Sequence, residues 1–141
     1  MTHLVKQYLL LIVAALLAAA CSPTAASPAS VKHGDLLISG AWARPAPKDG
    51  NGAIYLTIAN NGTQAERLMG VQTDVTPTAE LHQSKQKGNM MSMEPVSGGI
   101  VIPSGATVEL KPGDYHVMLI GLKRDLTAGE RLKITLQFER S

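Results

Sequence analysis

Residues 131–139 read RLKITLQFE, and apolar and polar side chains alternate strictly along this stretch. The apolar positions are Leu132, Ile134, Leu136 and Phe138, and every position between them is polar or charged. Successive side chains of a β-strand point to opposite faces, so the alternation predicts a strand with one face in a core and the other in solvent. The end of the chain is therefore expected to be a half-buried strand.

The rest of the chain from residue 35 onward has a similarly short rhythm. Its apolar runs are separated every eight to twelve residues by Gly, Pro, Asn and Asp clusters such as 60–62 and 111–114, which are typical of turns. No stretch of this part holds a helical period over three turns. We therefore expect a single all-β domain, a sandwich or a small barrel. The predicted strands are 36–44, 53–59, 65–72, 78–84, 92–96, 108–110, 115–122 and 131–139.

The predicted domain depends on an apolar core, because the chain has a single cysteine, Cys21, and so forms no internal disulfide. We expect Trp42, Tyr55 and Phe138 to be the large core side chains. Met69 is also expected to fill space in the core. The chain carries 13 Lys and Arg against 11 Asp and Glu. No basic patch for nucleic acid is evident.

The N-terminal segment resembles a secretory signal. Residues 8–20 form an uncharged apolar run of 13 residues after a short stretch with one lysine. This run is shorter than the roughly 20 residues that a permanent membrane-spanning helix requires. It ends in small residues before Cys21, as at a bacterial lipoprotein cleavage site, although Ala18 stands where such sites more often have Leu.

Two outcomes of export stay open from these residues. Residues 1–21 are expected to be the signal. Either Cys21 carries a lipid anchor to the membrane, or an ordinary signal cleavage falls near Ala20 or in the Ser/Ala stretch that follows. Residues 22–34 are small, polar and proline-containing, so we expect a flexible tether. Residues 35–141 are then the folded domain.

Methionine and histidine are unusually placed in this domain. Met90, Met91 and Met93 crowd together just after a polar, loop-like segment. Methionines of a core rarely bunch beside a loop, because their value is in filling buried gaps. His82 lies at the end of a predicted strand, and Met93 follows it with ten residues between. Each residue alone would be an ordinary core or surface residue, so only the combination carries weight.

His116 and Met118 are two residues apart in the predicted strand 115–122. Side chains two apart on a strand share a face and lie close enough to converge on one ion. Thioethers are soft donors and imidazoles are borderline, so a site built from both prefers Cu(I) to Zn(II) or Mg(II). Together with His82 and the methionine cluster, this pair predicts a Cu(I) site. The roles of Met90 and Met91 stay open.

The spacing of these residues resembles the signature of the periplasmic copper chaperones called PCu(A)C. Ten residues separate His82 from Met93, 22 residues separate Met93 from His116, and one residue separates His116 from Met118. The family spacing is 21 rather than 22, and Tyr115 stands where the family usually has Gly. The resemblance covers nearly all of residues 36–139. Its further matches are AWARP at 41–45, GAIYL at 52–56, MEPV at 93–96 and KPGDYHVML at 111–119.

The resemblance implies a cupredoxin-like Greek-key β-sandwich that binds one Cu(I) through His82, Met93, His116 and Met118. It favours Met93 over Met91, because only Met93 keeps the first spacing. It further implies a periplasmic protein that delivers copper to an acceptor, the binuclear copper centre of cytochrome oxidase or a Sco-type thiol protein. Catalytic turnover is not expected from such a protein.

Other functions compete with copper delivery. A blue-copper electron carrier requires a cysteine thiolate inside the domain, and Cys21 lies at the signal boundary. A copper-sequestering tolerance protein would use the same four residues, and a structural lipoprotein would use none of them. An enzyme is the least expected, because no nucleophile with a base and no carboxylate pair stands out.

Overall fold

The computed structural model describes residues 29–141, and all the regular structure in this part is β-strand. The expected all-β fold is therefore confirmed. The predicted signal and Cys21 lie outside the described residues. The strands are β1 (Val31–His33), β2 (Leu36–Ala43), β3 (Gly52–Asn60), β4 (Glu66–Thr73), β5 (Thr78–Lys87), β6 (Met90–Pro95), β7 (Ile100–Ile102), β8 (Thr107–Leu110), β9 (Tyr115–Ile120) and β10 (Ile134–Phe138).

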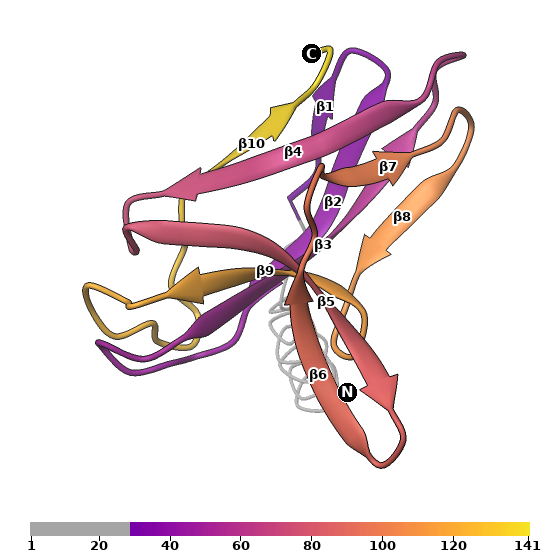
Figure 1. Cartoon of the computed structure of the whole chain (residues 1–141). Helices are drawn as coiled ribbons and strands as arrows, with labels where there is room; N and C mark the ends of the chain where they lie inside the picture. The colour runs from indigo at the N-terminus through magenta and orange to yellow at the C-terminus, as the bar shows by residue number, and fades with distance from the viewer. Residues whose placement is uncertain (1–28) are drawn as a thin grey trace, which may run out of the picture.

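The strands form two sheets with antiparallel pairing throughout. The larger sheet has the order β1-β2-β3-β9-β5-β6, and β8 also pairs with β3. The smaller sheet has the order β10-β4-β7 and forms a second layer that crosses the first (Figure 1). The hairpin of β5 and β6 projects beyond the rest of the larger sheet (Figure 1). The chain passes between the sheets before and after β4, before and after β7, and before β10.

One cluster of buried side chains joins the two sheets. Strand β3 contributes Ile54, Leu56 and Ile58, which alternate along the strand as a one-faced strand requires. Strand β9 contributes Val117 and Leu119, neither of which is exposed to solvent. The smaller sheet adds side chains from all three of its strands. These are Leu68, Val71, Ile100 and Ile102, with Ile134, Leu136 and Phe138 packed against them.

Two residues expected in the core lie outside it. Trp42 is 47% exposed and Met69 is 46% exposed. The alternation of the strands explains both errors, because Ala43 and Leu68 turn inward and their neighbours must therefore turn outward. Tyr55 is buried as expected, yet it shares the outer face with Trp42, which lies directly opposite it in the register of β2 and β3.

The prediction of a flexible tether over residues 22–34 does not hold for residues 31–33. Residues 31–33 form β1, which pairs with β2 through Val31↔Ile38, Lys32↔Leu37 and His33↔Leu36. Gly34 makes the tight turn between the two strands with a φ of 56°. All three residues of β1 are exposed, so the sequence has no alternation of apolar and polar residues that would indicate this strand. Within the described residues the folded domain therefore begins at Val31.

Candidate metal centre

His82 and His116 face each other from two neighbouring strands of the larger sheet, β5 and β9. The register of β5 and β9 places them directly opposite, and their ring centroids are 5.9 Å apart. Leu81 and Val117 turn into the core, so both histidines belong to the opposite face of the sheet. Even so they are only 7% and 4% exposed. The strands therefore bring two imidazoles together at a well-shielded position.

The two predicted methionine ligands lie on either side of this pair on the same face. Met118 lies opposite Glu80 on β5, and Met93 on β6 lies opposite Ser84. Both methionines are thus diagonal neighbours of His82, at a spacing of about 7–8 Å between backbones that long side chains can bridge. Met118 is half-buried, whereas Met93 is 59% exposed. To reach an ion at the histidines, the side chain of Met93 would have to fold back from solvent.

The hydrogen bonds of the two histidines leave one nitrogen free on each ring. Nδ1 of His116 lies 3.0 Å from the backbone oxygen of Asp114. A carbonyl oxygen only accepts, so Nδ1 of a neutral ring carries the hydrogen and Nε2 keeps its lone pair. In His82 it is Nε2 that is engaged, at 2.8 Å from Oε2 of Glu80, and Nδ1 is buried without a hydrogen-bond partner. Histidines that bind metals typically donate their other N–H in this way.

Two aromatic side chains pack in sequence beside His116. The ring of Tyr55 lies 6.4 Å from that of His116, and Trp42 packs on Tyr55 with centroids 4.5 Å apart. The guanidinium of Arg44 lies 5.7 Å from the centroid of Tyr55, within the range of a cation–π contact. These groups shield one side of the histidine pair and place a positive charge at its border.

Sequence reasoning missed Glu80 and the outward-facing role of Trp42 and Tyr55. The signal for Glu80 was present, because Glu80 and His82 are two residues apart on a strand and must share a face. The same rule had already paired His116 with Met118. Of the described residues, no three His, Cys, Asp or Glu side chains gather into a group that could hold a metal ion.

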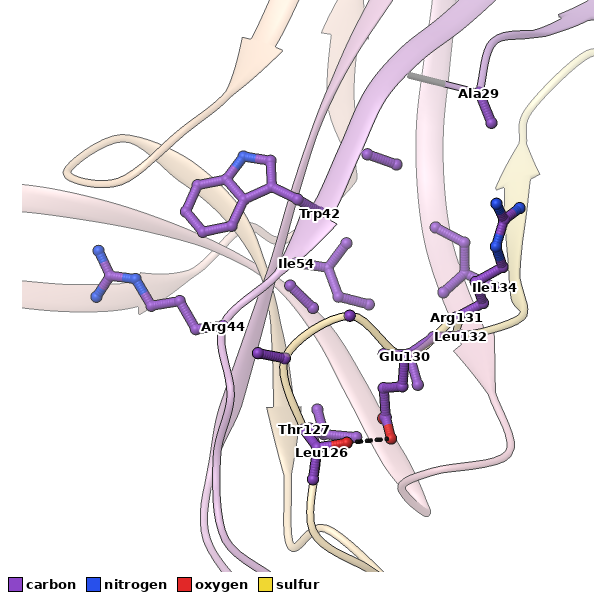
Figure 2. Close-up of a pocket in the computed structure, with 14 residues that line it drawn as sticks. Ala29, Trp42, Arg44, Ile54, Leu126, Thr127, Glu130, Arg131, Leu132 and Ile134 are labelled. Carbon is purple, nitrogen blue, oxygen red and sulfur yellow. Dashed lines mark hydrogen bonds between the residues drawn. The ribbon is translucent and has the colours of Figure 1, made fainter. Parts of the chain in front are cut away.

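A groove of about 460 Å³ lies apart from the histidine pair. Figure 2 shows it between the end of β2 and the segment 126–134, where the hydroxyl of Thr127 is hydrogen-bonded to Glu130 at 3.1 Å. Trp42 lines this groove and also packs on Tyr55, whose ring lies beside that of His116. None of the four predicted ligands lines the groove. No helix long and apolar enough to cross a membrane occurs in residues 29–141.

The fold is similar to solved domains of one type. The "Apo PCuAC domain from PmoF1" aligns with a TM-score of 0.65 at 26% identity, over 79% of this chain and 89% of that one. The "Copper-bound PCuAC domain from PmoF2" aligns with a TM-score of 0.65 at 21% identity, over 79% and 88%. The architecture is thus a cupredoxin-like β-sandwich of the PCuAC type, as the resemblance implied.

The chain belongs to the LpqE-like family, described as "Putative lipoprotein LpqE-like", whose model matches residues 36–141. It is 31% identical over 116 residues to "Putative lipoprotein Lxx21020" of Leifsonia xyli subsp. xyli (strain CTCB07), covering 82% of this chain and 69% of the relative. It is 32% identical over 102 residues to "Uncharacterized protein RP573" of Rickettsia prowazekii (strain Madrid E), covering 70% and 56%. The matched part thus spans little more than half the length of the Rickettsia relative.

Proposed function

We propose that this chain is an exported copper chaperone that holds one Cu(I) between His82, Met93, His116 and Met118. The observation that carries the proposal is the pair of buried histidines, opposite each other, each with one ring nitrogen free of hydrogen bonds. Two methionines flank the pair on the same sheet face. The solved PmoF2 domain of this fold is described as copper-bound, which supports the choice of metal.

The proposed ligands favour Cu(I) over other ions. Two imidazoles and two thioethers are all neutral, so they do little to offset the second charge of Cu(II). Thioether sulfur is soft and binds Cu(I) better than it binds Zn(II). We therefore expect Cu(I) to bind more tightly than Cu(II) or Zn(II).

Delivery, rather than storage, is proposed because one of the four proposed ligands is accessible from solvent. Met93 lies on the projecting hairpin (Figure 1) and is 59% exposed, so an incoming protein could contact this proposed ligand from that side. The acceptor is proposed to be the binuclear copper centre of cytochrome oxidase or a Sco-type thiol protein. Thiolates bind Cu(I) more strongly than thioethers do, which would draw the ion onward.

An anaerobic Cu(I) titration with X-ray absorption tests the site. We expect one Cu(I) per chain and sulfur among its neighbours. A first shell of nitrogen and oxygen alone would contradict the proposed ligands, and no binding at all would leave the chain as a structural lipoprotein. Mixing the Cu(I) form with a copper-free acceptor domain then separates delivery from sequestration, because only a chaperone gives up its ion at comparable protein concentrations.

The chain is also proposed to be anchored to a membrane through Cys21 after export to the periplasm. The family and the Leifsonia relative are both described as lipoproteins, which supports this localisation. Mass spectrometry of the protein from membranes should find an acylated Cys21 at the mature N-terminus. A soluble protein that begins downstream of Cys21 would rule out the anchor, and Cu(I) binding should survive Cys21→Ser in either case.

A further inference from the structure

Glu80 is placed to control the orientation of His82. It lies two residues before His82 on β5 and opposite Met118, so its side chain is on the same face as the proposed ligands. Its Oε2 atom lies 2.8 Å from Nε2 of His82. The Glu80 side chain is 43% exposed, whereas that of His82 is 10% exposed. The carboxylate therefore stands at the border between the buried ring and solvent.

The chemistry of this contact selects one tautomer of His82. A carboxylate accepts hydrogen bonds and does not donate them, so Nε2 must carry the hydrogen of the neutral ring. The lone pair is then on Nδ1, which is buried and has no hydrogen-bond partner. A buried nitrogen with a free lone pair is rare, because unpaired polar atoms in a protein interior are unfavourable. Such an atom beside a second imidazole is suited to receive an ion.

His116 has the opposite arrangement. Its Nδ1 atom is held by the backbone oxygen of Asp114, so its free nitrogen is Nε2. The backbone fixes that choice regardless of the side chain at position 114. For His82 the choice depends on one replaceable side chain, Glu80. The two histidines would thus offer an ion different nitrogens, and only for His82 does the choice depend on a side chain.

We infer that Glu80 is a positioning residue that holds His82 with Nδ1 directed at the copper ion. This inference rests on the proposed function, and it deepens it by naming the ligand atoms. Outer groups of this kind typically change metal affinity by about 10–100-fold when they are removed. The role does not require Glu80 to touch the ion.

Nuclear magnetic resonance of the copper-free full chain tests the inference directly. Long-range ¹H–¹⁵N correlations of the imidazoles distinguish the two tautomers and the doubly protonated ring. We expect the Nε2–H tautomer for His82 and the Nδ1–H tautomer for His116. Glu80→Leu should disturb the first without changing the second. A wild-type His82 that carries its hydrogen on Nδ1, or on both nitrogens, would overturn the inference.

Cu(I) affinity provides the second measurement. Glu80→Leu should weaken binding by about 10–100-fold, and Glu80→Gln should restore most of the loss, because its amide oxygen can still accept from Nε2. Glu109→Leu is the matched control, since Glu109 is exposed on β8 and pairs with Lys111. An unchanged affinity in Glu80→Leu, or an equal loss in Glu80→Gln, would refute positioning by this hydrogen bond. If the wild type binds no copper, the proposed function fails. The tautomer of His82 in the copper-free chain still tests whether Glu80 orients the ring.

Discussion

His82 and His116 are nearly as well buried as the core, although they lie on the face of the sheet that is turned away from it. Buried polar atoms are normally hydrogen-bonded, yet Nδ1 of His82 is buried without a partner, and His116 is hydrogen-bonded through Nδ1. The arrangement is unfavourable for a protein that never binds a ligand at this position. It is favourable for one that places an ion between the two rings.

At the level of single residues, truncation of the proposed ligands should separate copper binding from folding. His116→Ala or Met118→Ala should weaken Cu(I) binding at least tenfold, about 1.4 kcal/mol, because each removes one donor atom. The measurement is competition against a Cu(I) indicator under anaerobic conditions. Met69→Leu is the control. Because Met69 is 46% exposed, its replacement should change both stability and copper affinity very little.

The β5–β6 hairpin decides which methionine can serve as a ligand. Met93 lies opposite Ser84, and Met91 lies opposite Gln86, one pleat further from His82 toward the hairpin tip. We therefore expect Met93→Leu to lower Cu(I) affinity at least tenfold and Met91→Leu to leave it within about twofold. The two variants make a matched pair, since both side chains are exposed to a similar degree, 59% and 58%. A larger loss in Met91→Leu would move the ligand assignment one pleat along the hairpin.

The β1–β2 hairpin depends on a single glycine. Gly34 has a φ of 56°, a conformation in which a Cβ atom is strained, so Gly34→Ala should destabilise the turn by about 1–2 kcal/mol. Gly34→Asn should cost less, because Asn tolerates this conformation better. Hydrogen exchange should then be faster in the amides of β1 and remain slow in β3 and β9. Uniformly faster exchange would show that β1 is coupled to the whole domain.

Elements were predictable from sequence wherever one face is buried and the other is not. The strand at 115–122 was recognised because Val117 and Leu119 alternate with His116 and Met118, and the structure places these pairs on opposite faces. β1 gave no such signal, because backbone pairing to β2 holds it and nothing in it is buried. The size of Trp42 suggests a core residue. Its neighbour Ala43 packs against the core, so Trp42 lies on the outer face of the strand. The contact between Glu80 and His82 follows from spacing, but its distance required the structure.

At the scale of the whole molecule, Glu66 ties the C-terminal end of the chain to β4. Its carboxylate accepts hydrogen bonds from the backbone N–H groups of Arg67 and Arg140 at 2.8 and 3.2 Å and from the hydroxyl of Ser141 at 3.1 Å. Burial by itself raises the pKa of Glu66, but these hydrogen bonds outweigh burial and hold the pKa below its ordinary value of 4.5. The ionised form of Glu66 therefore favours the folded state.

This contribution of Glu66 should be lost in acid. It is complete above the unfolded pKa and disappears as the pH falls through the lower pKa of the folded protein. Urea unfolding between about pH 6 and pH 3 should thus show falling stability, and Glu66→Gln should reduce the slope. Glu109→Gln, at an exposed site, should follow the wild type. An identical slope in wild type and Glu66→Gln would mean that other carboxylates cause the acid loss.

The exposure of Met93 also makes the site vulnerable to oxidants. Peroxide converts an accessible thioether to a sulfoxide, which is polar and no longer a soft donor, and methionine sulfoxide reductases reverse the change. Met93 is 59% exposed while Met118 is half-buried, so mild peroxide should oxidise Met93 before Met118. Peptide mass spectrometry alongside a Cu(I) titration would follow both events, and equal oxidation of the two methionines would contradict the order. The side from which the proposed copper transfer would proceed is thus also the side on which oxidative damage would begin and repair would be needed.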